Sequence, residues 1–295
     1  MKIIRTIKQM HAASGQAKSR LKKIGFVPTM GALHEGHLTL VRKSKKENDL
    51  TVVSIFVNPA QFGPDEDFTI YPREEKKDIF LLKKENVDII FYPSANEMYP
   101  SEYLTYIEVA KISEVLCGQS RPGHFRGVAT VVGKLLNIVS PDTIYLGQKD
   151  AQQCVVIRQM IHDLNFSVAT KVVPTVREAS GLAMSSRNQY LSQEQREEAA
   201  ALYQVLRMAR EHILKGEHRA DEIVRLIHNH IQTHTSAQIE YAACVDAHSL
   251  ESLKILNGDV LVALAVRLGP ARLIDNIIVR LEKQIKQHAA VKQET

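Results

Sequence analysis

The chain has 295 residues and a formal net charge of +5, and 44% of its residues are hydrophobic and 24% charged. This balance predicts a globular chain long enough for two modest domains, and the mild basic excess suits nucleotides, organic acids or nucleic acid without choosing among them. Three widely spaced cysteines without a CxxC pair argue against a disulfide framework or a cysteine-rich metal site, so we expect a cytoplasmic protein. No apolar run of about 18 residues is present, so we expect no membrane span.

Apolar runs alternate with helical patterns over the first part of the chain. The runs predict strands at residues 24–27, 51–57, 88–92, 143–146 and 168–173. They are continuous rather than alternating, which is typical of strands covered on both faces. Helical patterns lie between them at residues 37–48, 74–86, 128–139 and 150–163. The alternation predicts a mostly parallel sheet with crossover helices, in which ligands bind beyond the carboxyl ends of the strands.

The pattern changes near residue 180. Amphipathic helical patterns at residues 193–214 and 220–234 precede strand-like segments at 239–245, 259–268 and 271–281. They predict a smaller α+β domain. We therefore expect two domains, residues 1–178 and residues 179–295, with the second serving as a lid, and a frayed polar tail over the last dozen residues.

The segment PTMGALHEGH follows the first predicted strand and enters a helix. Its glycines allow close approach of a ligand, and free N–H groups at a helix N-terminus suit phosphate. His34 and His37 are three residues apart, so both imidazoles can donate hydrogen bonds to phosphate oxygens as pyrophosphate leaves. Two alternatives remain open: the pair caps the helix, or it binds a metal ion, although the zinc-protease motif needs histidines at i and i+4.

Two further segments place polar side chains beside that loop. Asn58 and Gln61 follow the second predicted strand, where their amides can orient a hydroxyl or a carboxylate, although Asn-Pro is also a common turn. Arg121 and His124 open the helix at residues 128–139 in the segment RPGHFRG, where they suit an anion or belong to a surface loop.

Two later segments complete a layout typical of a nucleotide site. In GQKDAQQ, Gly147 permits close approach, Lys149 supplies a charge for phosphate, and Asp150 either caps the next helix or accepts from a ribose hydroxyl. In MSSRN, the two hydroxyls and Arg187 can clamp phosphate or lie on an inert surface. Neither a P-loop GxxxxGK[ST] nor a GxGxxG fingerprint is present.

The motifs together resemble one family. PTMGALHEGH, FVNPAQFGPDEDF, YPR, RPGHFRGV, GQKDAQQ and VREASGLAMSSRNQYL stand in the order and spacing of the pantothenate synthetase family, from residue 24 to about residue 191. RLIDN at residues 272–276 is similar to the family's closing segment. HEGH at residues 34–37 also resembles the HIGH signature, and MSSR at residues 184–187 the KMSKS loop, of the wider nucleotidyltransferase superfamily.

The resemblance implies an α/β fold, with a Rossmann-like parallel sheet that carries a HIGH-type nucleotide site and a smaller α+β C-terminal domain, usually in a homodimer. Its reaction joins pantoate to β-alanine through a pantoyl-adenylate and converts ATP to AMP and pyrophosphate. The implied catalytic residues are His37, His34, Lys149 and Arg187. The implied ATP contacts are Met30, Gly31, Ala32, Leu33, His34, Glu35, Gly36, His37, Gly147, Gln148, Lys149, Asp150, Val176, Met184, Ser185, Ser186 and Arg187. The implied substrate contacts are Gln61, Gln153, Asn58 and Arg121. The family often has glutamate at the position of Gln148.

The implied reaction needs no protein nucleophile, so catalysis would consist of positioning and charge stabilisation. We expect Mg²⁺ to bridge the ATP phosphates rather than to occupy a protein cage, with Asp78 as a candidate helper. Two other functions stay open: another adenylyltransferase on the same fold, and a nucleic-acid-binding protein that has kept the scaffold. The absence of a basic block and of tryptophan argues against the second. The apolar residues 260–266 are a candidate dimer interface.

Overall fold

The computed structural model describes residues 1–64 and 66–282, so the polar tail expected over the last dozen residues lies outside the described residues. The strands are β1 Lys2–Ile4, β2 Ile24–Thr29, β3 Leu50–Ile55, β4 Ile89–Phe91, β5 Thr143–Gly147, β6 Ala169–Val173, β7 Gln238–Asp246, β8 Asp259–Leu268 and β9 Ala271–Arg280. The α-helices are α1 Ile7–Ser19, α2 Glu35–Glu47, α3 Glu75–Lys84, α4 Ala95–Met98, α5 Cys117–Ser120, α6 His124–Val139, α7 Ala151–Asp163, α8 Gln193–Glu198, α9 Ala200–Leu214 and α10 Ala220–His234. Short 3-10 turns are η1 Pro59–Gln61, η2 Gln148–Asp150 and η3 Ser186–Tyr190.

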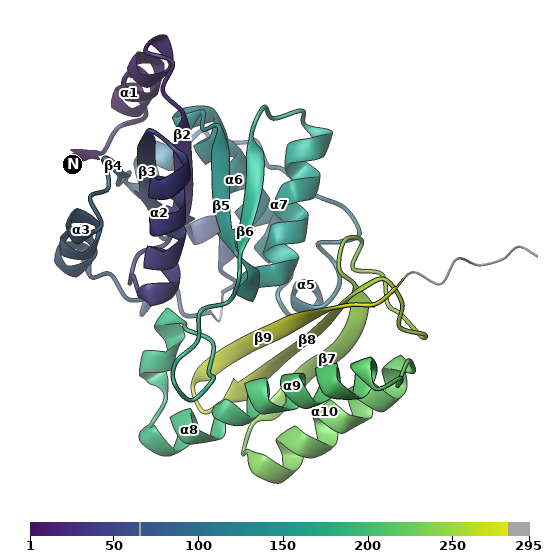
Figure 1. The fold of residues 1–295 in the computed structure, drawn as a ribbon. Coiled ribbons are helices and arrows are strands. Elements are labelled where there is room, and N and C mark those ends of the chain that lie inside the picture. Colours follow the sequence, from purple (N-terminus) through teal and green to yellow (C-terminus); the bar gives the residue numbers. More distant parts are fainter. Residues whose placement is uncertain (65, 283–295) are drawn as a thin grey trace, which may run out of the picture.

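The first unit is a six-stranded sheet in the order β1-β4-β3-β2-β5-β6, and every neighbouring pair is parallel. The chain lays β2, β3 and β4 side by side in one direction, then returns to the other side of β2 with β5 and β6 (Figure 1). The loops after β2 and β5 therefore diverge, and the space between them is where ligands of such sheets bind.

Helices cover both faces of this sheet. On one face, α1, α6 and α7 bury their apolar residues against β2, β3 and β5 in the largest apolar cluster of the molecule. On the other face, α2 and α3 pack against β2, β3 and β4. Helix α6 is apolar almost all round and almost wholly buried, as expected for a helix enclosed by neighbours. Its burial fixes the position of its N-terminus next to η1.

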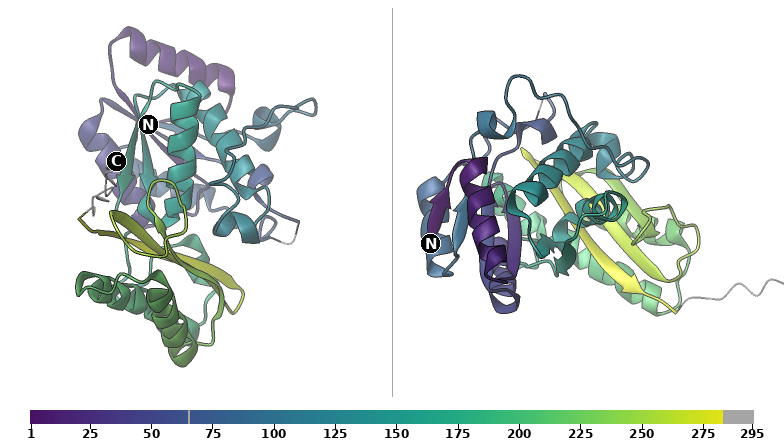
Figure 2. Two further views of the ribbon diagram at one scale, coloured as in Figure 1. Left: turned by 90° about the vertical axis from the view of Figure 1, so that its right-hand side faces the viewer. Right: turned by 90° about the horizontal axis from the view of Figure 1, so that it is seen from above.

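The second unit is an antiparallel sheet in the order β7-β8-β9, covered on one face by α9 and α10 (Figure 1). Its other face meets the first unit, where Leu261 and Ala263 of β8 pack against Leu116 and against Val155 of α7. Figure 2 shows this sheet lying across the end of the parallel sheet, below the loops that follow β5 and β6. The two units therefore share a buried interface rather than a linker alone.

The observed elements agree with the predicted α/β class and correct several details. Strand β1 and helix α1 were not predicted, because a three-residue strand and a helix with few buried residues give little apolar periodicity. Strand β6 is not covered on both faces: it is an edge strand whose exposure alternates along the chain. The helix predicted at residues 193–214 is divided at Ala199 into α8 and α9.

The candidate dimer interface at residues 260–266 is also corrected. These residues belong to β8, the central strand of the second sheet, and each of them is buried. Their apolar character serves the two cores on either side of the sheet.

Candidate active site

A cleft of about 1370 Å³, including its open mouth, lies between the carboxyl ends of β2 and β5 and the loop before η3. Sixteen of the predicted site residues line it: Met30, His34, Gly36, His37, Asn58, Gln61, Arg121, Gly147, Lys149, Asp150, Gln153, Val176, Met184, Ser185, Ser186 and Arg187. Five others do not line it: Gly31, Ala32, Leu33, Glu35 and Gln148. The sheet topology thus brings together segments that are far apart in the sequence.

The two histidines of the first loop cap helix α2. His34 is the N-cap residue, and its Nδ1 accepts the N–H of Gly36 at 3.2 Å. His37 Nδ1 accepts the N–H of His34 at 3.3 Å. Because each Nδ1 is an acceptor, each neutral ring carries its proton on Nε2. The capping alternative is therefore confirmed, and it leaves two N–H donors at the helix end.

Both rings favour the neutral state. Burial, and then the nearby Lys149 charge, lower the pKa of His34 from 6.5 to about 4. Burial and the neighbouring His34 lower the pKa of His37 well below 6.5. The ring centroids are 4.1 Å apart, so two positive charges there would repel each other. The pair acts as two neutral hydrogen-bond donors near neutral pH.

The rest of the first loop is structural. Ala32 and Leu33 are buried, and their N–H groups donate to the two carboxylate oxygens of Asp78 at 3.0 and 2.8 Å. Asp78 is 1% exposed and does not line the cleft, so the geometry does not support its predicted role as a helper for Mg²⁺. Its carboxylate instead fixes the loop that carries His34. Glu35 points outward and pairs with Arg42.

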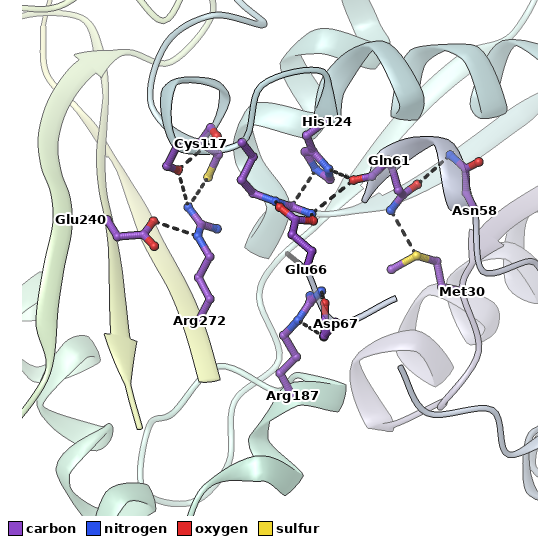
Figure 3. Close-up of polar contacts among 12 residues, drawn as sticks. Met30, Asn58, Gln61, Glu66, Asp67, Cys117, His124, Arg187, Glu240 and Arg272 are labelled. Atoms are coloured by element: carbon purple, nitrogen blue, oxygen red, sulfur yellow. Dashed lines mark hydrogen bonds and ion pairs between the residues drawn. The ribbon is translucent and has the colours of Figure 1, made fainter. Parts of the chain in front are cut away.

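Two buried amides follow β3. Asn58 donates to the side-chain oxygen of Gln61 and to the backbone oxygen of Gly127, each at 3.1 Å. Gln61 in turn donates to the sulfur of Met30 at 3.1 Å, as Figure 3 shows. These contacts orient the Gln61 amide at the wall of the cleft. A Met–amide contact is weak, so a polar substrate group can replace it.

Arg121 is held by a carboxylate and an imidazole. It forms a two-pronged ion pair with Glu66, at 2.6 Å for each contact, and its Nη1 lies 3.0 Å from His124 Nε2. Since arginine only donates, His124 Nε2 accepts, and Nδ1 donates to the Gln61 carbonyl at 2.8 Å. Burial, and then Arg121, lower the pKa of His124 to about 4.

His124 lines the cleft but was not among the predicted site residues. The segment RPGHFRG carried the signal, because Arg121 and His124 at a helix N-terminus both suit an anion, but only Arg121 was predicted as a substrate contact. Tyr71 was also missed: its hydroxyl lies 3.1 Å from Ser186 Oγ, and the hydroxyl of Thr175, another lining residue, is buried without a partner among the described residues.

Arg187 repeats the arrangement of Arg121. Its guanidinium forms a two-pronged ion pair with Asp67 at 2.8 and 2.9 Å and lies 5.6 Å from the centre of the Tyr71 ring. Glu66 and Asp67 are consecutive, so one short segment neutralises two arginines, and Figure 3 shows the Asp67 carboxylate at Arg187 with Glu66 directed away from it. An anion that binds either arginine must share it with, or displace, one of these carboxylates.

The loop after β5 presents Lys149 and Asp150 to the cleft, 3.6 Å apart. Gln148 points the other way and donates to Asn276 of β9 at 3.0 Å. The predicted ATP contact at Gln148 is therefore not supported by the geometry, and its side chain joins the two units. Gln153, one turn into α7, faces the cleft beside Asp150.

Asp150 is the one carboxylate residue among the described residues that line this cleft. Its side chain is 45% exposed. Within residues 1–64 and 66–282, no group of three or more His, Cys, Asp or Glu could hold a metal ion. A single carboxylate beside Lys149 fits Mg²⁺ only if the ion is held chiefly by other ligands, such as the phosphates of a nucleotide.

The cleft therefore combines neutral imidazole donors, a lysine, two arginines and amides, with no activated nucleophile among the described lining residues. Such a set can bind a triphosphate and a small carboxylic acid and stabilise the charge that develops as they react. The fold and the site define a nucleotide-dependent enzyme of the α/β class.

Comparison with known proteins identifies the family within this class of enzymes. The model of the family described as "Pantoate-beta-alanine ligase" matches residues 2–278. A pantothenate synthetase of Thermotoga petrophila is 54% identical over 94% of this chain and 99% of its own length, and one of Caldicellulosiruptor bescii is 53% identical over 95% and 99%. The chain belongs to the pantoate–β-alanine ligase family, and it is an ATP-dependent ligase.

Solved structures agree. A pantothenate synthetase of Thermus thermophilus superposes with a TM-score of 0.89 at 41% identity, covering 94% of this chain and 99% of the other. The pantoate–β-alanine ligase of Francisella tularensis, solved with beta-gamma ATP and β-alanine, gives a TM-score of 0.77 at 40% identity over 94% and 97%. In the part of the chain that is described, no helix combines the length and the apolar character needed to cross a bilayer.

Proposed function

We propose that this chain joins pantoate to β-alanine in two steps in the cleft between β2 and β5, through a pantoyl-adenylate. The observation that carries this proposal is the pair of neutral histidines at the N-terminus of α2: both line the same cleft as Lys149, and both use Nδ1 as a cap, which leaves Nε2 to carry the proton. Donors of this kind suit a triphosphate whose negative charge shifts towards the leaving pyrophosphate.

In the first step, a carboxylate oxygen of pantoate attacks the α-phosphorus of ATP. The new O–P bond forms while the bond to pyrophosphate breaks, and no protein group becomes covalently attached. His34 and His37 donate to the phosphates, and Lys149 balances the charge of the leaving group. ATP lies along the loops at residues 30–37, 147–150, 176 and 184–187.

The acid is held by three amide side chains that line the same cleft. Gln61, Asn58 and Gln153 provide donors and acceptors that suit hydroxyl and carboxylate groups, and Arg121 adds a positive charge. The cleft is also lined by the apolar residues Val131, Val132 and Leu135, which suit the branched carbon skeleton of pantoate.

In the second step, the amine of β-alanine attacks the acyl carbon of the mixed anhydride. A C–N bond forms, AMP leaves, and the nitrogen loses a proton to solvent. The anhydride must be kept from water until then. The loop between the two units shields the anhydride, because it supplies three residues to the lining of the cleft: Ser185, Ser186 and Arg187.

Mg²⁺ would be held by the phosphates of ATP together with Asp150, and when bound it supplies charge neutralisation at those phosphates. Removing divalent ions with EDTA should then abolish AMP formation, and added Mg²⁺ should restore it.

The proposal is tested by AMP release from ATP and Mg²⁺ with pantoate and β-alanine supplied singly and together. AMP should form only with both acids, and pantoate alone should support exchange of pyrophosphate into ATP. Lys149→Ala should weaken both reactions, whereas the control Lys171→Ala removes the same charge from the exposed edge strand β6 and should not. Pyrophosphate exchange that does not need pantoate would overturn the acid assignment.

We further propose that the chain works as a homodimer in the cytoplasm. The outer edges of β7 and β9, which pair with no other described strand, are candidate contacts. All three cysteines are free and buried, which suits a reducing compartment. Light scattering that gives one chain's mass at micromolar concentration would refute the dimer.

A further inference from the structure

Two adjacent polar residues of β9 are buried in the second unit, next to the loops of the cleft. Asp275 is 3% exposed and Asn276 is 5% exposed. Buried polar groups in folded proteins are almost always hydrogen-bonded, so their partners reveal what they hold. The partners of these two residues lie in two different loops of the cleft.

Asn276 holds the loop that carries Lys149. Its side-chain NH₂ donates to the backbone oxygens of Gln148 at 3.1 Å and Lys149 at 2.9 Å. Its side-chain oxygen accepts from the Gln148 side chain at 3.0 Å. Both amide hydrogens and the oxygen are thus used on one turn, η2. The direction of the backbone at Lys149 is fixed by a residue 127 positions away.

Asp275 holds a second loop, the one that carries Val176 and Met184. Its carboxylate accepts two bonds from Arg177, at 2.6 and 2.9 Å. Arg177 also donates to the Gly181 oxygen at 3.1 Å. The N–H of Met184 donates to the Val176 oxygen at 3.0 Å, which closes the segment into a narrow hairpin. The guanidinium of Arg177 therefore attaches this hairpin to β9.

The geometry of a strand explains how neighbours can serve two loops. Successive side chains of a strand point to opposite faces of its sheet. Leu273 and Val279 lie an even number of residues from Asp275, so they point to the same face of the sheet. They pack in the core under α9 and α10. Ile274 points to the same face as Asn276, and it packs against the core of the first unit. One strand therefore reaches Arg177 on one face and the Lys149 loop on the other.

We propose that Asp275 and Asn276 are positioning residues for ATP: they fix the spacing between the Lys149 loop and the Val176–Met184 hairpin without touching the nucleotide. This inference rests on the nucleotide site proposed above. Misplacement of a binding group by about 1 Å can cost about 10²-fold in rate, so a rigid spacer between two contact loops has a large effect. The second unit thus contributes to ATP binding through its sheet.

The test uses Asn276→Ala and Arg177→Lys in the full chain. Lysine keeps the charge beside Asp275 but lacks the two-pronged donor geometry. The control Tyr241→Phe removes a different contact between the units, the one between the Tyr241 hydroxyl and Cys117 Sγ at 3.1 Å, and touches neither loop. Dissociation constants for ATP come from calorimetry, KM values for ATP and pantoate from initial rates, and loop order from amide hydrogen exchange.

Asn276→Ala should weaken ATP binding about 10-fold or more, as expected when the three hydrogen bonds of Asn276 to η2 are lost, and leave the KM for pantoate within about twofold. Amide exchange should accelerate at residues 147–151. Arg177→Lys should raise the KM for ATP in the same direction and accelerate exchange at residues 176–184. Tyr241→Phe should change neither constant beyond about twofold.

The inference fails if either variant binds ATP as the wild type does, or if the KM values for ATP and pantoate rise equally, because that pattern indicates general loosening. If Asn276→Ala does not fold, Asn276→Ser, which keeps one donor, takes its place. Together with Arg177→Lys it tests the inference by the same comparison of the KM for ATP with the KM for pantoate. Failure of the proposed nucleotide site gives a different result: Lys149→Ala would then bind ATP normally, whatever the β9 variants do.

Discussion

At the scale of single residues, each imidazole of the HEGH segment has two functions, one for each ring nitrogen. Nδ1 of His34 and of His37 accepts a backbone N–H and helps to cap α2. Nε2 then carries the proton and serves as a donor. The capping contact fixes both the tautomer and the orientation of the ring. The contact that begins the helix therefore also orients the Nε2–H group that we propose as a donor to phosphate.

Substitutions of His37 can separate these two functions. Asparagine places an acceptor near Nδ1, and glutamine places an N–H near Nε2. We expect His37→Ala and His37→Asn to lower turnover about 10²–10³-fold, as for loss of one preorganised donor, and His37→Gln to lose much less. Initial rates with saturating substrates measure this. Equal losses for asparagine and glutamine, or an alanine variant within threefold of the wild type, would contradict the assignment.

The depressed pKa of His34 predicts a dependence of stability on pH. The folded chain holds this pKa at about 4, whereas the ordinary value is 6.5. Between these values the unfolded chain binds a proton that the folded chain does not bind. The contribution of the neutral ring is therefore present above pH 6.5 and is lost as the pH falls towards 4.

Accordingly, the Tm of the wild type should fall more between pH 7 and pH 5 than the Tm of His34→Asn, which keeps a capping acceptor but does not titrate. Thermal scans at a series of pH values measure the difference. His37 and His124 titrate in the same direction, so the variant should reduce the slope without removing it. Parallel curves for the two proteins would show that burial does not depress this pKa.

At the scale of elements, the position of α6 against η1 sets the amide wall of the cleft. Gly127 lies where the helix crosses η1, and a Cβ atom there would lie 2.1 Å from the Ala60 backbone oxygen. The same glycine gives its carbonyl to Asn58. Close approach of two backbones thus determines where Asn58 and Gln61 stand.

Two glycine substitutions in helices should therefore have opposite effects. Gly127→Ala should destabilise the chain by about 1–3 kcal/mol and raise the KM for pantoate, because Ala60 cannot move without Gln61. Gly15→Ala, in the exposed part of α1 where nothing lies within 4 Å, should stabilise the chain by about 0.5–1 kcal/mol and leave KM unchanged. Denaturant titrations and initial rates test both. A stabilising Gly127→Ala would refute the close approach.

At the scale of the whole molecule, the two units unfold as one body if their shared interface is as important as its burial indicates. Leu261 is 2% exposed and belongs to the apolar cluster that joins β8 to α7. The ion pair of Arg177 with Asp275 and the bonds of Asn276 cross the same boundary. We propose that the predicted domain boundary at residues 178 and 179 separates two architectures, the parallel and the antiparallel sheet, within one cooperative unit.

We expect calorimetry to show a single transition, and Leu261→Ala to move all of it to lower temperature, with a loss of about 2–5 kcal/mol as for other large-to-small core changes. The control Leu21→Ala changes a side chain that is 92% exposed and should shift the transition little. Two transitions, of which only one responds to Leu261→Ala, would show that the units unfold independently.

The sequence by itself determined the parallel sheet, the helices between its strands and the loops that carry the chemistry. Strand and helix periodicity, a glycine next to a strand end and a histidine at a helix start act over a few residues, so they can be read locally. The predicted loops at Met30, Asn58 and Gly147 do meet in one cleft, because parallel strands present their carboxyl ends at one edge.

Only the tertiary structure decided which side chains face that cleft and what holds them. Arg121 is paired with a carboxylate 55 residues away, Arg187 with one 120 residues away, and Gln148 with an amide 128 residues away. Ala32 and Leu33, which resemble contact residues in the sequence, give their N–H groups to Asp78. Local patterns specify the backbone conformation, whereas the partner of a side chain depends on which distant segments pack beside it.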